Sequence, residues 1–289
     1  MGAATEEVVL SSDALEAVLL PGLGCRLHRL RAFGQDLLRT PATPADHAAD
    51  PFNRGGYVLA PWTNRASARP MTVAGRTVHL RPNFPDGTAI HGQVSLRPWK
   101  RVGDAAWAVE GGGEGWPWPY RVTLDAAVDG ARLDLRYRLE NRSDAPMPAG
   151  LGIHPWFAGP ESVALSAARV VPRNDERGVA PVAASGEWSL AAGRRPWLGL
   201  DATWLDVDPP RATLRWSSGI RLELEALRRP SGPLQFAVAS PHTPDAVAVE
   251  PVTHAPWALD ALADGDATAM PLLDPGDVLE LDVSLSAHR

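Results

Sequence analysis

The sequence predicts an all-β protein, built as a large antiparallel β-sandwich or barrel. Three observations lead to this fold class. The 289 residues include 28 prolines and 26 glycines with no triplet period, which leaves little room for long helices. Hydrophobic residues make up 45% and charged residues 21% of the chain, enough to bury a sizeable core. Several segments alternate apolar and polar residues and are separated by short turns.

The alternation is clearest in residues 132–140, 221–226 and 279–285, where apolar residues occupy every second position. Each segment is expected to be a strand with one buried and one solvent-exposed face. Turn sequences lie next to these segments: Asp129-Gly130, Ser218-Gly219 and Pro275-Gly276. Half-exposed strands joined by short turns predict antiparallel sheets.

Helical signals are few. Residues 256–263 are expected to form about two helical turns, with Pro256 near the first position. Residues 178–199 are weakly patterned and are expected to be rich in loops. Because no composition shift, linker or repeat divides the chain, a single domain over residues 1–289 is expected.

Composition and charge exclude several kinds of partner. The net charge of -6 gives no electrostatic reason to expect nucleic-acid binding. No stretch approaches the roughly 18 apolar residues of a membrane span, and residues 1–12 lack a secretory signal, so a cytoplasmic protein is expected. The single cysteine, Cys25, excludes an intramolecular disulfide framework. A monomer or homodimer is expected.

Two histidines have contexts suited to proton transfer near neutral pH. His91 precedes Gly92, whose missing side chain allows a ligand to approach closely. His154 precedes Pro155, which favours an extended backbone, and nearby glycines leave space around the ring. The alternative for each is a hydrogen-bonded histidine at a strand end.

Glu250 directly follows Ala246–Val249, four small apolar residues that predict a buried strand. A buried carboxyl group is either paired or raised in pKa, and a raised pKa suits a general base. Alternatively, Glu250 lies at the surface, because Pro251 is expected to end the strand.

Asn64 and Arg65 follow Trp62, and this set of donors, acceptors and an aromatic face suits a polyhydroxylated ligand. Lys100 is the single lysine of the chain, so arginine is used almost everywhere else, and a surface ion pair is the alternative for Arg65. Asp201 follows a predicted loop and is uninformative by itself.

Taken in order, these pieces resemble the aldose 1-epimerase (mutarotase) family. The likeness rests on five motifs: Asn64-Arg65, His91-Gly92, His154-Pro155-Trp156-Phe157, Asp201 and Glu250-Pro251. It extends to the segments 20–38, 115–157 and 273–276, and so covers nearly the whole chain. The five motifs in this order are specific to the family, whereas no single motif is.

The resemblance implies a single large β-sandwich, often called a supersandwich, that holds the sugar on a concave sheet without a metal or organic cofactor. By position, His154 matches the family's general acid and Glu250 its general base. His91 and Arg65 match residues that hydrogen-bond the sugar. Asp201 matches a further sugar contact, with Asp206 and Asp208, which lie close by in the sequence, as alternatives. Asn64, Trp62 and Trp156 are also expected to bind the sugar.

The activity implied is interconversion of the α and β anomers of a hexose by acid–base ring opening and reclosure. A related enzyme for a phosphorylated or sulfonated sugar is also consistent with the resemblance, and its anionic substrate would need arginines. Five arginines flank the first two motifs: Arg54, Arg69, Arg76, Arg81 and Arg97.

Two further functions are compatible with the residues: a non-catalytic carbohydrate-binding protein, and a glycoside hydrolase that uses Asp201 and Glu250 as its two carboxyl groups. The carbohydrate-binding protein would not need the His154–Glu250 pair, and a histidine acid fits reversible ring opening better than hydrolysis. A metal site at His91, His154 and Glu250 lacks the support of a short-spaced ligand pair.

Overall fold

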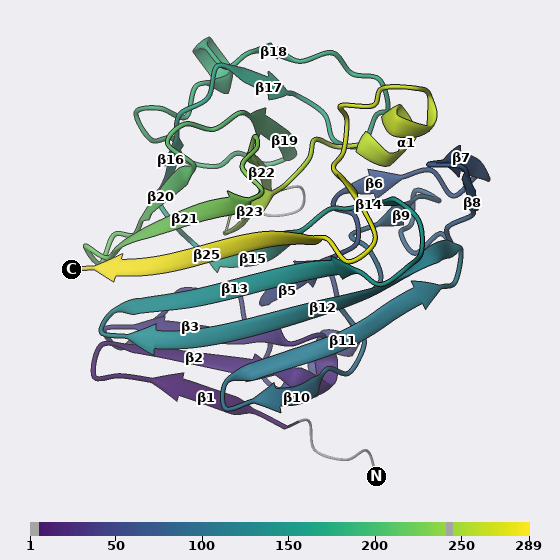
Figure 1. The fold of residues 1–289 in the computed structure, drawn as a ribbon. Helices are drawn as coiled ribbons and strands as arrows, with labels where there is room; N and C mark the ends of the chain where they lie inside the picture. Colours follow the sequence, from purple (N-terminus) through teal and green to yellow (C-terminus); the bar gives the residue numbers. More distant parts are fainter. Residues whose placement is uncertain (1–5, 241–244) are drawn as a thin grey trace.

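Two large antiparallel sheets pack face to face and bury the main core between them (Figure 1). The computed structural model describes residues 6–240 and 245–289; the first five residues of the N-terminal segment lie outside this range. The 8-stranded sheet runs in the order β10 (Lys100–Gly103), β11 (Ala106–Gly113), β12 (Trp116–Asp129), β13 (Arg132–Asn141), β25 (Val278–His288), β21 (Arg221–Arg229), β20 (Arg211–Arg215) and β16 (Ser162–Leu165).

In Figure 1, strands β3, β5 and β15 of the 11-stranded sheet are partly covered by the smaller sheet, and its strands β17, β18 and β19 appear above. Its order is β1 (Val8–Ser11), β2 (Leu15–Leu20), β3 (Arg26–Ala32), β5 (Gly56–Leu59), β15 (Gly152–Ala158), β23 (Ala246–Val252), β22 (Gln235–Ser240), β19 (Leu200–Leu205), β17 (Arg169–Val171) and β18 (Val182–Ala183), with β4 (Gln35–Asp36) paired to β3. The predicted all-β, antiparallel fold class is confirmed.

The smaller sheet follows the alternation seen in the sequence. In β13, Leu133, Leu135 and Leu139 are buried in the core, whereas Arg136 and Arg138 are exposed. Strands β21 and β25 show the same pattern, and both pair with neighbours of this sheet over most of their length. One face of each strand therefore packs on the larger sheet and the other meets solvent.

The central strands of the larger sheet are buried on both faces. In β15, Ile153 and Phe157 belong to the core between the sheets, so period-two alternation turns His154 and Trp156 to the opposite face. In β23, Val247 and Val249 face the core in the same way. A second, smaller apolar cluster around Tyr57, Trp156 and Ala248 covers the outer face.

The remaining elements are short. Three two-stranded pairs join β6 (Arg65–Ala66) to β9 (Ala89–Ile90), β7 (Met71–Val73) to β8 (Arg76–Val78), and β14 (Met147–Pro148) to β24 (Leu272–Leu273). Residues 178–199 are rich in loops as predicted, with only β18 and a 3-10 helix at Gly186–Trp188. None of the helices in the described ranges is long and apolar enough to cross a membrane.

Two sequence expectations need correction. The helix α1 spans Ala258–Ala263 and begins later than expected, because Trp257 at its N-cap has a left-handed backbone with φ of 60°. Pro256 therefore precedes the helix. Strand β23 does not end at Pro251 but continues to Val252, because its pairing with β22 and β15 extends past the proline.

Candidate active site

A cavity of about 490 Å³ opens on the outer face of the larger sheet, opposite the main core. Strands β5, β15, β23 and β19 contribute side chains, and the segment around β6 and β9 adds others. The lining includes every predicted site residue except Trp62: Asn64, Arg65, His91, His154, Trp156, Asp201 and Glu250. The fold thus brings together residues that are distant in the sequence.

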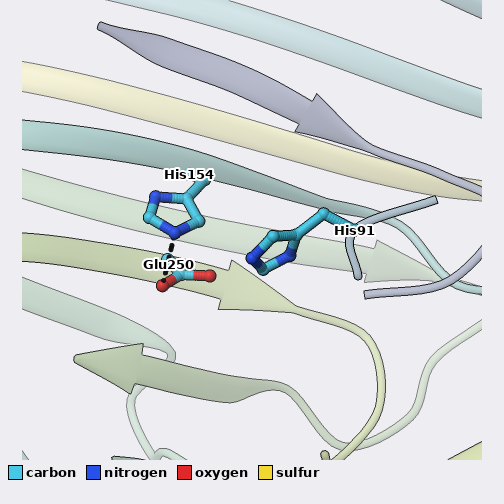
Figure 2. Close-up of side chains that lie close together, drawn as sticks. All are labelled: His91, His154 and Glu250. Atoms are coloured by element: carbon cyan, nitrogen blue, oxygen red, sulfur yellow. Dashed lines mark ion pairs between the residues drawn. The ribbon is translucent and has the colours of Figure 1, made fainter. Parts of the chain in front are cut away.

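His154 and Glu250 face each other across two neighbouring strands. The β15–β23 ladder pairs Gly152 with Val252 and Trp156 with Ala248, which places His154 opposite Glu250 between these two pairs. The Nε2 atom of His154 lies 3.2 Å from Oε1 of Glu250 (Figure 2). Both side chains are buried, so the surface position considered for Glu250 is wrong.

Burial favours the neutral form of both groups. It raises the pKa of Glu250 well above its ordinary value. The charge of Asp201 raises this pKa further, and the charge of Arg65 lowers it. Burial also lowers the pKa of His154 well below its ordinary value, with His91 and Arg26 adding to the effect. In this neutral form the pair holds one acidic proton, on Glu250, and moving that proton to His154 produces an imidazolium facing a carboxylate.

His91 lies beside this pair (Figure 2), with its ring 5.0 Å from that of His154. Its Nδ1 accepts a hydrogen bond of 3.3 Å from the backbone N–H of Asn64. Burial lowers the pKa of His91 to about 3, so the ring is neutral and its proton lies on Nε2. His91 is therefore a hydrogen-bond donor in the cavity wall.

The same tautomer bears on metal binding. His91, His154 and Glu250 each have a potential ligand atom within 4.8 Å of the others, and two histidines with one glutamate form a known zinc-binding set. A histidine binds a metal through a nitrogen lone pair. In His91, Nδ1 already accepts the Asn64 hydrogen bond and Nε2 carries the proton, so this arrangement disfavours a metal ion.

Arg65 is buried, not a surface ion-pair residue as local sequence context suggested. Its Nε donates to Asp86 at 2.8 Å and its NH1 donates to Asp201 at 3.3 Å. The guanidinium also lies over the ring of Phe84, 5.3 Å from its centre. These contacts fix one guanidinium in the cavity wall.

Asp201 lies near the start of strand β19, just after the predicted loop, and lines the cavity together with Asp175. Burial raises its pKa, while Arg65 and a hydrogen bond from Asn174 oppose that increase. The neighbouring candidate Asp206 instead pairs with Arg169 at 2.7 Å.

Several residues of the site carry no recognisable signal in the sequence. Asn174 is buried and donates from Nδ2 to Asp201 at 2.7 Å. Tyr57 stacks on His154 with 4.6 Å between ring centres and 19° between planes. Phe52 accepts a hydrogen bond of 2.6 Å from the indole N–H of Trp156 through its backbone carbonyl. Their roles depend on cross-strand contacts, which a single sequence does not reveal.

Trp62 is the one predicted site residue outside the cavity lining. Its ring stacks on Trp116 at 5.3 Å, and both belong to the main core. Trp62 lines a separate, smaller cavity with Arg81 and Leu96. The other predicted tryptophan, Trp156, does line the site, with 5.4 Å between the centre of its ring and that of His154.

Comparison with known proteins agrees with this architecture. A family model described as "Aldose 1-epimerase" matches residues 6–183, more than half of the chain. The chain belongs to the aldose 1-epimerase family. This is a family of isomerases, and the resemblance identified from the sequence motifs is confirmed.

Solved structures with the aldose 1-epimerase fold superpose on almost the whole chain. A candidate aldose 1-epimerase from Escherichia coli K12 has a TM-score of 0.82 at 18% identity and covers 99% of both chains. An aldose epimerase homologue from C. elegans has a TM-score of 0.79 at 17% identity and also covers 99% of both. A galactose mutarotase-like protein from Clostridium acetobutylicum has a TM-score of 0.80 at 17% identity, covering 99% of this chain and 96% of its own. At these identities the likeness establishes the fold.

A search of curated proteins found no significant match to this sequence. The segment that matches the aldose 1-epimerase family model contains His91 and His154 but ends before Asp201 and Glu250. The placement of those two carboxyl groups at the site therefore rests on the geometry of strands β19 and β23.

Proposed function

We propose that this chain interconverts the α and β anomers of a neutral hexose, with Glu250 as general base and His154 as general acid. The observation that carries the proposal is the contact of 3.2 Å between His154 and Glu250 inside a cavity lined by further hydrogen-bonding groups. The anomeric hydroxyl and the ring oxygen are bonded to the same carbon. An acid and a base this close can therefore act on both oxygens at once.

Proton transfer within the pair first gives a Glu250 carboxylate and a His154 imidazolium. Glu250 then takes the proton of the anomeric hydroxyl while His154 protonates the ring oxygen, and the bond between that oxygen and the anomeric carbon breaks. The open-chain aldehyde rotates about its bond to the next carbon. Ring closure on the opposite face returns both protons, with the two groups exchanging roles.

The other polar groups of the cavity suit binding of the sugar. Arg65 and the Nε2–H of His91 can donate hydrogen bonds, and Asp201 can accept them. The amide of Asn64 offers both a donor and an acceptor, and the ring of Trp156 offers an apolar face. A hexose presents hydroxyl groups on its rim and C–H bonds on its faces, which this mixture complements.

The charge of the cavity favours a neutral sugar. Arg65 and Arg173 line it together with the carboxyl groups of Asp175, Asp201 and Glu250. Arg173 is 60% exposed and pairs with Asp175 at 3.1 Å. Of the five arginines considered for an anionic group, none lines the described cavity, and four pair with carboxylates elsewhere: Arg54, Arg69, Arg76 and Arg97.

Polarimetry on glucose, galactose and a hexose 6-phosphate tests the substrate class. We expect catalysed mutarotation of at least one neutral hexose and a much slower reaction of the phosphorylated sugar. Faster turnover of the 6-phosphate would favour an enzyme for anionic sugars. Binding of sugar without any rate enhancement would favour a non-catalytic protein.

Glu250→Gln and His154→Asn test the catalytic pair. Each change keeps the approximate side-chain shape and removes one proton carrier, so we expect the mutarotation rate to fall by about two to four orders of magnitude. Circular dichroism should show an unchanged fold. A variant with a near-wild-type rate would exclude that residue from the reaction.

A further inference from the structure

The catalytic pair proposed above belongs to a longer row of side chains that crosses four adjacent strands. Tyr57 of β5 pairs directly with His154 of β15, and Glu250 of β23 lies opposite His154. On the other side, β3 pairs with β5 through Leu27 and Gly56, so Arg26 lies opposite Tyr57 one step along the antiparallel ladder. The row thus reads guanidinium, phenol, imidazole, carboxyl.

Ring contacts connect each step of this row. The Cζ atom of Arg26 lies 4.7 Å from the centre of the Tyr57 ring. The Tyr57 ring in turn stacks on His154 at 4.6 Å. Because the three residues occupy successive strands in register, Tyr57 separates Arg26 from His154. The stack limits tilting of the imidazole, whose Nδ1 has no hydrogen-bond partner among the described residues.

The charge of Arg26 is not neutralised by a carboxylate. Its side chain is fully buried, and its two terminal nitrogens donate to the backbone carbonyls of Arg54 and Pro51, each at 2.8 Å. Within residues 6–240 and 245–289, no carboxylate comes within ion-pair distance of it. Burial lowers the pKa of Arg26 to about 10, so the group remains charged near neutral pH.

We propose that Arg26 and Tyr57 are positioning residues for the reaction proposed above. Tyr57 fixes the plane of the His154 ring, and the positive charge of Arg26 weakens the hold of the His154–Glu250 pair on its shared proton. A more weakly held proton is delivered more readily to the ring oxygen of the sugar. This role depends on the proposed function, since it acts through His154.

Other titratable groups lie near the row of Arg26, Tyr57, His154 and Glu250. His91 and Tyr57 pack against His154, while Asp201 and Arg65 act on Glu250. On the far side, His28 and His47 adjoin Arg26, and burial lowers the pKa of both, to about 3 for His47. Asp50 partly offsets the charge of Arg26, although it bonds to Asn53 and Arg54. Arg26 is therefore a fixed charge that changes little over the pH range of interest.

Replacing Arg26 by a neutral residue tests the electrostatic part. In Arg26→Gln the pair should hold its proton more tightly, so both limbs of the pH–rate profile should move to higher pH by on the order of one unit. Arg26→Lys keeps the charge and should leave both limbs within a few tenths of a unit. A folded Arg26→Gln protein with unmoved limbs overturns the proposal, because loss of packing alone lowers the rate without displacing the profile.

Tyr57 gives a second test that does not require a change at the buried arginine. Tyr57→Phe keeps the stacked ring and should lower kcat much less than Tyr57→Leu, which removes the ring and should lower kcat at least tenfold. Equal effects of the two changes would contradict the positioning role.

Nuclear magnetic resonance separates this inference from the proposed function. The His154 ring signals can be titrated in wild type and Arg26→Gln without sugar, and the pKa of His154 is expected to be higher in the variant. If wild type catalyses no mutarotation, the proposed function fails while the titration still tests the effect of Arg26. If wild type is active but the titration is unchanged, only the inference about Arg26 fails.

Discussion

Asn174 is joined to Asp201 through both its side chain and its backbone. Its Nδ2 donates to Oδ1 of Asp201 at 2.7 Å, and its backbone N–H donates to the Asp201 carbonyl at 3.0 Å. The Oδ1 of Asn174 accepts from Thr203 at 2.8 Å, and its backbone carbonyl accepts from the indole of Trp257 at 2.9 Å. Asn174 therefore holds the carboxyl group of Asp201 in one orientation.

Asn174→Ala should raise KM about tenfold with a small effect on kcat, because a hydrogen bond to a charged group is worth about 1.5 to 3 kcal/mol. Asn174→Asp keeps the volume but places a second carboxyl group against Asp201, and should raise KM at least as much. Steady-state polarimetry with a neutral hexose measures both parameters. A fall in kcat at unchanged KM would show that Asn174 does not act through sugar binding.

Single residues could be predicted where their local sequence is unusual. His154 before Pro155 and Glu250 after four small apolar residues stand out, and the structure places both in the cavity. Asp201 could be selected only through the family resemblance. Tyr57, Asn174 and Arg26 could not be selected, because their roles arise from pairing between strands that are far apart in the sequence.

At the scale of elements, the loop after β9 shows how a glycine supports the site. Gly92 has φ of 75°, and a Cβ atom at this position would lie 1.9 Å from the carbonyl oxygen of Ala60. That oxygen accepts a hydrogen bond of 2.7 Å from the N–H of Gln93. The close approach of the two backbones positions the preceding residue, His91, beside His154.

Gly92→Ala should lower the free energy of unfolding by about 3 kcal/mol or more, since it combines a left-handed backbone with a steric clash. Gly87→Ala is a matched control: its φ is 82°, but a Cβ atom there would have no neighbour within 4 Å. The control should lose only about 1 kcal/mol. Urea denaturation measures both values, and equal losses would show that the contact with Ala60 has no energetic importance.

The strands differ in how well the sequence predicts them. Strands β13, β21 and β25 alternate regularly because one face meets solvent, so their positions could be predicted. Strand β15 is buried on both faces and contains a proline, so its sequence lacks that period. The start of α1 is not predictable to the residue, because the left-handed backbone of Trp257 has no propensity signal.

For the whole molecule, buried histidines predict loss of stability in mild acid. Burial lowers the pKa of His91 to about 3 and of His254 to about 4, whereas unfolded histidines titrate near 6.5. The unfolded chain therefore binds more protons below pH 6.5, and stability falls as the pH falls until the folded values are reached. Each histidine should contribute about 2 kcal/mol of lost stability between pH 7 and pH 5.

The His154–Glu250 pair should contribute little to this change, because the neutral folded pair holds one proton and the unfolded His154 and Glu250 together also bind about one proton in mild acid. Urea denaturation at pH 7 and pH 5 measures the combined effect. His254→Gln should reduce the pH dependence by about a third, because His47, whose pKa burial also lowers to about 3, contributes as much as His91 and His254. Equal stability of the wild-type protein at both pH values would contradict the assignment of His91 and His254 as neutral groups.

The position of β15 between β5 and β23 also affects how the chain acquires its site. Both ladders join segments roughly a hundred residues apart, and such distant pairings are slow because a long loop must close first. The proposed acid, His154, lies near the middle of the sequence and the proposed base, Glu250, in its last sixth. While the chain is being synthesised, the part that emerges first contains His91 and His154. In that part β15 can pair with β5 on one edge, but its other edge has no partner until β23 is made. Sugar turnover should therefore begin only when the final strands have joined the sheet, which makes activity a sensitive measure of complete folding.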